Sequence, residues 1–150
     1  MSLRDDITRD TREAMKGRDR LRVGALRMLT AALKNGEIEK GGPLTENEEQ
    51  AILRRQLKQR EESAEAFRKA GREDQAQAEE AEAEIVRRYL PAPLSDEELE
   101  ELADEAIRET GATSMKDMGA VMGRAMARAG NRADGRRLSA LVRERLQVDI

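Results

Sequence analysis

Residues that favour β-strands are scarce in this chain, and that scarcity restricts its possible folds more than any other feature. Val, Ile and Thr together supply 17 of the 150 residues, and no more than two of them stand side by side. Ala and Arg, with 22 residues each, and Leu, with 15, dominate the composition instead. Ala, Arg and Leu all favour helices over strands. We therefore expect an all-α protein.

Apolar residues recur at helical spacing in four segments of the first 90 residues. A hydroxyl residue followed three positions later by an acid predicts a helix start at Ser2 and at Thr45. Glycines mark the expected stops. The expected helices cover roughly residues 2–16, 19–40, 45–70 and 71–89. Their expected buried faces include Met15 in the first and Ala78 in the fourth.

Two prolines in alternate positions mark the clearest boundary, at Leu90-Pro91-Ala92-Pro93-Leu94. We expect an N-terminal bundle of about four helices over residues 1–90, a linker over residues 91–94, and a small three-helix domain over residues 95–150. In that second domain, Ser95 and Glu98 form a capping box, Thr113 or Ser114 caps the next helix, and Asp134 caps the last. The middle helix has an apolar face that begins at Met115 and continues through further methionines.

The chain has a net charge of only -3, but acidic and basic residues are unevenly distributed along it. Residues 91–110 hold eight acids and one base, whereas residues 111–150 hold eight bases and four acids. Lys116, Arg124 and Arg128 follow one row along the predicted sixth helix, and Gly119 and Gly123 follow the adjacent row. A bare strip of backbone beside a basic row permits close approach of another helix or of a nucleic-acid backbone. The following loop and helix start add Arg132, Arg136 and Arg137.

The composition also excludes several kinds of chemistry. The chain has no Cys, His or Trp, one Phe and one Tyr. Disulfide frameworks, zinc fingers, Ser-His-Asp catalysis and base-stacking aromatic platforms all need residues that are missing. We expect no catalytic residue, no metal site and no cofactor. No apolar stretch approaches 18 residues, so we expect no membrane span and a cytoplasmic protein.

One string of residues carries a family resemblance. Residues 114–123, Ser-Met-Lys-Asp-Met-Gly-Ala-Val-Met-Gly, followed by Ala133-Asp134-Gly135, resemble the YqeY family (GatB/YqeY). The stretches Arg27-Met28, 57–60, 70–72 and 89–91 are also similar to stand-alone members, so the resemblance spans the whole chain. It implies two helical domains, the second of them similar to the tail of the GatB subunit of the tRNA-dependent amidotransferase.

The resemblance also implies a connection with RNA, because that tail domain helps to bind the body of the tRNA. The positions that match the family are Lys116, Gly119, Gly123, Ala133, Asp134 and Gly135. To these the local charge adds Arg124, Arg128, Arg132, Arg136 and Arg137. The ATP-using portion of GatB and the subunit that releases ammonia from glutamine have no counterpart in this sequence.

Three hypotheses about function follow. The first is a tRNA-binding accessory module that catalyses nothing itself and has no DNA specificity. The second is a component of a carbon–nitrogen ligase, a glutamine-dependent amidotransferase, acting with partner subunits. The third is a helical adaptor for other proteins. The partners expected are tRNA and amidotransferase or aminoacyl-tRNA-synthetase subunits.

Overall fold

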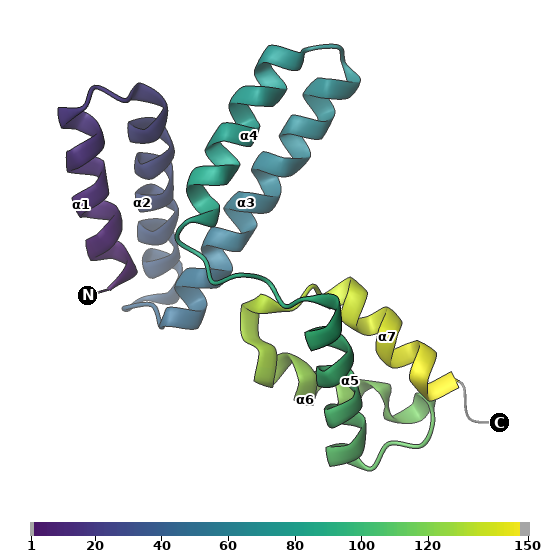
Figure 1. Ribbon diagram of the computed structural model, residues 1–150. Helices are drawn as coiled ribbons and strands as arrows, with labels where there is room; N and C mark the ends of the chain where they lie inside the picture. Colours follow the sequence, from purple (N-terminus) through teal and green to yellow (C-terminus); the bar gives the residue numbers. More distant parts are fainter. Residues whose placement is uncertain (1, 148–150) are drawn as a thin grey trace. The chain divides into compact units, whose positions relative to one another are not determined.

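The computed structural model describes residues 2–147 apart from the side chain of Asn131, and these residues form helices and no strand (Figure 1). The all-α prediction is therefore confirmed. Two short 3-10 turns, η1 (Met115–Asp117) and η2 (Gly130–Arg132), precede the last two α-helices. The α-helices are α1 (Leu3–Lys16), α2 (Arg20–Lys40), α3 (Glu46–Lys69), α4 (Glu73–Arg87), α5 (Asp96–Thr110), α6 (Met118–Ala129) and α7 (Gly135–Gln147).

The predicted helix starts rest on hydrogen bonds between side chains and backbone. Ser2, Thr45 and Ser95 each accept a hydrogen bond from the backbone N–H three residues on, and the acid at that position bonds back. These reciprocal bonds satisfy N–H groups that have no partner inside the helix. Gly41 and Gly111 end α2 and α5 in the left-handed conformation, which glycine adopts without steric cost.

The chain forms two compact units, Met1–Pro91 and Ala92–Ile150. In the first unit, α1 pairs with α2 and α3 pairs with α4, while α2 contacts both helices of the second pair (Figure 1). Leucines of α2 and α3 fill the core together with Ile7 and Ala14 of α1 and with Ile85 and Val86 of α4. The completely buried leucines are Leu26, Leu29, Leu33 and Leu53.

The outer halves of α3 and α4 pack through alanine and are bordered by ion pairs. Ala64 of α3 and Ala76 and Ala83 of α4 are buried. Ala78, expected on the buried face, is exposed. Its assignment was wrong because alanine supplies every apolar residue in this half of α4, so hydropathy does not distinguish the two faces. Met15 of α1, also expected to be buried, is 52% exposed.

The second unit is a three-helix arrangement in which α5, α6 and α7 all contact one another. Leu99, Leu138 and Val142 are buried at its centre, and Val121 is the buried residue that α6 contributes beside Ala125. The methionines of α6 itself lie partly buried at the edge of this core, whereas Met115 is 38% exposed. Met115 is not on the helix face because residues 115–117 form the turn η1, which changes the register before α6 begins.

Of the residues expected as a linker, Pro91 belongs to the first unit and residues 92–94 belong to the second. Leu94 packs against its core, and the backbone N–H of Leu94 donates to the carbonyl of Arg132 at 2.9 Å. The guanidinium of Arg132 in turn donates to the carbonyl of Ala92 at 3.0 Å. These contacts fix the entry of the chain into α5.

Candidate nucleic-acid interface

The glycines of α6 form a strip of bare helix surface. Gly119 and Gly123, which we call the glycine strip, are both exposed. A Cβ added at either position has no neighbouring heavy atom within 4 Å. Glycine inside a helix destabilises the helix by about 1 kcal/mol relative to alanine. No packing contact among the described residues offsets this loss at Gly119 or Gly123. The sequence suggested two uses for a bare strip. One of them, close packing against another helix of the same unit, does not occur among the described residues.

Arg124 and Arg128 lie one turn apart on α6 beside the strip, whereas Lys116, expected in the same row, lies before α6 in η1. We call Lys116, Arg124 and Arg128 the basic ridge; all three are exposed. Arg128 donates to Glu109 at 2.7 Å and to Glu105 at 3.0 Å. The Nε atom of Arg124 lies 3.3 Å from the other carboxylate oxygen of Glu109. The last two turns of α5 thus partly neutralise the ridge, while Lys116 has no acidic partner among the described side chains.

These two glutamates are the residues that the sequence analysis missed. A signal was present, since Glu105 and Glu109 are four residues apart on α5 just as Arg124 and Arg128 are on α6. Matching rows of opposite charge on two helices favour one another when the helices pack side by side. The glutamates are 44% and 34% exposed, so water and ions compete for the arginines they hold.

The remaining predicted residues gather at η2 and the start of α7. Asp134 accepts hydrogen bonds from the backbone N–H groups of Arg136 and Arg137, at 2.9 and 3.4 Å, and so begins α7 as expected. Gly135 is exposed in the first turn. The side chain of Arg137 forms an ion pair with Asp96, whereas Arg136 has no acidic partner among the described residues.

The structure therefore places the predicted residues in two groups within one unit. Gly119, Gly123, Arg124 and Arg128 occupy exposed positions of α6, and Lys116 is exposed just before it in η1. Arg132, Asp134 and Arg137 serve first as structural contacts, because each bonds to the N-terminal part of the unit or caps α7. The glycine strip and the basic ridge are thus the stronger candidate for contact with a ligand.

Within the range that the structure describes, no cluster of three or more acids is arranged to hold a metal ion. The described helices also include none with the length and apolar character needed to cross a membrane.

Comparison with known proteins shows the family to which the chain belongs. The model for Yqey-like proteins matches residues 4–146 of the chain. The chain belongs to the YqeY family. The family match covers both compact units, so the N-terminal helical pairs belong to the family pattern as well as the second unit.

Three relatives illustrate the range of the family. "Altered inheritance of mitochondria protein 41, mitochondrial" from Clavispora lusitaniae is 36% identical over 94 residues, which cover 61% of this chain and 55% of that protein. The protein of the same name from Eremothecium gossypii is 34% identical over 110 residues, covering 71% and 60%. The E-type subunit of glutamyl-tRNA(Gln) amidotransferase from Thermococcus gammatolerans is 37% identical over 87 residues, covering 55% of this chain and 14% of that protein. The matched segments thus span less than two thirds of each relative.

Proposed function

We propose that this YqeY-family chain is a tRNA-binding accessory module that holds tRNA on α6 and catalyses no reaction itself. The observation that carries the proposal is the glycine strip, which is open to solvent beside the basic ridge and has no packing role in its own unit. A helix surface without side chains lets a sugar-phosphate backbone approach the helix closely. The guanidinium groups alongside match the geometry of phosphate oxygens.

The ion pairs between the ridge and α5 suggest how phosphate would bind, by displacing the glutamate partners of the arginines. Arg124 and Arg128 are held by exposed glutamates, and exposed ion pairs contribute little free energy. A phosphate can therefore replace Glu109 as the partner of these arginines at small cost. Because the chain has one Tyr and one Phe, recognition rests on phosphate contacts and shape rather than on base stacking.

The relatives support the RNA part of this proposal. One of them is named as part of an amidotransferase that acts on glutamyl-tRNA(Gln), and this chain matches 14% of it. A chain that corresponds to so small a part of that relative fits a binding role better than a complete catalytic one. A non-catalytic module is therefore the simplest function consistent with the match.

Binding of a tRNA transcript to the purified chain, followed by fluorescence anisotropy, tests the proposal. We expect Arg124→Gln/Arg128→Gln to weaken binding about tenfold at low salt, because two phosphate contacts are lost. The charge-reversing pair Arg124→Glu/Arg128→Glu should weaken it further. Arg55→Glu/Arg72→Glu, in exposed positions of the first unit, is the control for net charge. Unchanged affinity in both ridge variants contradicts the proposal.

A second candidate, a component of a glutamine-dependent amidotransferase, is favoured by the same match to the E-type amidotransferase subunit. It predicts that the chain restores transamidation to a reaction that contains the other subunits but lacks GatB. Absence of any restored activity, while tRNA binding is retained, counts against this candidate and leaves the accessory module standing.

A further inference from the structure

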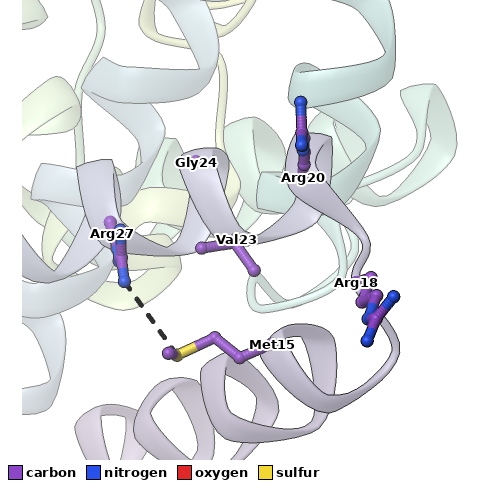
Figure 2. A pocket seen from close by; sticks show the side chains of 6 residues that line it. All are labelled: Met15, Arg18, Arg20, Val23, Gly24 and Arg27. Carbon is purple, nitrogen blue, oxygen red and sulfur yellow. Dashed lines mark hydrogen bonds between the residues drawn. The ribbon is translucent and has the colours of Figure 1, made fainter.

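A hollow of about 450 Å³ opens between α1 and α2, at the end of the hairpin where the chain turns. Figure 2 shows Met15 of α1 pointing toward Val23 and Arg27 of α2, with Arg18 and Arg20 at the turn. We call this site the arginine hollow. It is lined by Met15, Arg18, Arg20, Val23, Gly24 and Arg27.

The arginines of the hollow differ from those that border the α3–α4 pair in the same unit. Arg60, Arg68 and Arg87 each form ion pairs with glutamates of the α3–α4 pair. Among the described residues, by contrast, no carboxylate pairs with a guanidinium of the hollow; the contact made by Arg27 is with the sulfur of Met15, at 4.0 Å. Three guanidinium groups that line one hollow without an anion create a positive potential there.

The floor of the hollow is apolar and unusually open. Met15 is 52% exposed, although its position on α1 predicted burial. Gly24 lies within α2, and a Cβ added there has no heavy atom within 4 Å. As on α6, a helical glycine that costs about 1 kcal/mol has no packing role in its own unit. The hollow therefore combines cations at its edge with bare backbone and an apolar side chain at its base.

The backbone at the turn also keeps an arginine at this edge. Arg18 has a φ of 55°, the positive value that glycine favours, and it is the non-glycine residue with positive φ in the described chain. The neighbouring Gly17 has an ordinary φ of -80°. Holding a side chain in this conformation costs roughly 1 kcal/mol. The Arg18 side chain lines the hollow at the turn, at the end away from Arg27 (Figure 2).

We infer that the arginine hollow is a second RNA contact, which takes backbone phosphates on the guanidinium groups around it and the face of an attached ribose or base on Met15 and Val23. The inference rests on the proposed tRNA-binding function and extends it to the first unit. A continuous polyanion fits this surface better than a short acidic peptide, because the excess of positive charge extends along residues 1–36, with nine bases against five acids. The planar fork of arginine also matches phosphate oxygens.

The test uses the full chain with its methionine methyl groups labelled with ¹³C and titrated with a tRNA transcript. Met15 reports on the hollow, and Met122 and Met126 report on α6. We expect tRNA to shift the Met15 resonance, which a Met15→Leu variant identifies. The shift should be lost in Arg20→Gln/Arg27→Gln and retained in the control pair Arg55→Glu/Arg72→Glu.

The outcomes separate this inference from the proposed function. If the α6 methyl groups shift and Met15 does not, the second contact is refuted and the proposed function stands. If Met15 shifts while the α6 methyl groups do not, the hollow binds RNA and the α6 site is refuted. Poly-L-glutamate is titrated in parallel. If it shifts Met15 at a lower concentration of charge than tRNA does, the hollow takes an acidic peptide and the RNA assignment is wrong.

Discussion

Arg128 of α6 and Glu109 of α5 are joined by a 2.7 Å hydrogen bond at the edge of the basic ridge. Both side chains are exposed to solvent, so Glu109 is a partner that an anionic ligand can displace. The same carboxylate also holds Arg124. In the proposed binding mode, Glu109 competes with phosphate for both Arg124 and Arg128, and that competition is open to measurement.

Removing the competing carboxylates should strengthen RNA binding. In Glu105→Gln/Glu109→Gln, Arg124 and Arg128 lose their anionic partners while the side chains keep their size. We expect tRNA affinity to rise about fivefold, because exposed ion pairs of this kind compete only modestly. Glu100→Gln/Glu101→Gln, at exposed positions on the same helix, is the matched control. An equal rise in both variants would show a general charge effect instead of release of the ridge.

Replacing the glycines of the strip by alanine should have opposite effects on stability and on tRNA binding. Gly119→Ala and Gly123→Ala each add a methyl group where nothing lies within 4 Å. Each should stabilise the unit by about 0.5–1 kcal/mol through helix propensity. Urea denaturation followed by circular dichroism measures this gain.

The same two variants should bind tRNA more weakly if RNA lies against the bare backbone. Gly36 offers the contrast, because a Cβ added there would lie 2.4 Å from Cδ1 of Ile52. We expect Gly36→Ala to show a smaller stability gain and unchanged tRNA affinity. A more stable Gly119→Ala/Gly123→Ala variant with full affinity would mean that RNA does not contact the strip.

A hydrogen bond between distant parts of the first unit gives a prediction for pH. The hydroxyl of Tyr89 donates to the carboxylate of Asp10. This bond holds the pKa of Asp10 below its usual value. Burial, together with the same bond, raises the pKa of Tyr89 to about 12. We expect Tyr89→Phe to reduce the free energy of unfolding by about 1–2 kcal/mol at neutral pH.

The difference between wild type and Tyr89→Phe should depend on pH in a defined way. The neutral tyrosine is favoured in the folded state, so its contribution is complete below pH 10, the ordinary pKa, and is lost as pH rises toward 12. The ionised Asp10 contributes above its ordinary pKa of 3.8, and that contribution is lost as pH falls through the lower folded value. Denaturation curves across pH check this window. A difference that stays constant from pH 8 to pH 11.5 would contradict it.

The sequence predicted the helices well because their signals are local. The capping residues Ser2, Thr45 and Ser95 specify helix starts by bonds within four residues, and the structure has those bonds. The buried faces of α1 and α4 were harder, since Met15 and Ala78 have neighbours determined by packing between helices.

The same distinction applies to the candidate site: features within one helix could be predicted, and contacts between helices could not. Spacing along α6 was enough to place the glycine strip beside the basic ridge. Pairing of Arg128 with Glu109, and the exposure of Gly119 and Gly123, depend on how α5 packs against α6. The arginine hollow depends likewise on the pairing of α1 with α2, and residues 1–36 revealed only an excess of positive charge.

The salt dependence of tRNA binding tests the central claim most directly. Each phosphate contact contributes a slope of roughly -0.7 to -0.9 to the logarithm of affinity against the logarithm of salt concentration. We predict a steep negative slope for the wild type, and a slope shallower by about two contacts in Arg124→Gln/Arg128→Gln. A slope near zero, or the same slope in wild type and ridge variant, would contradict the assignment of α6 as the surface that holds tRNA.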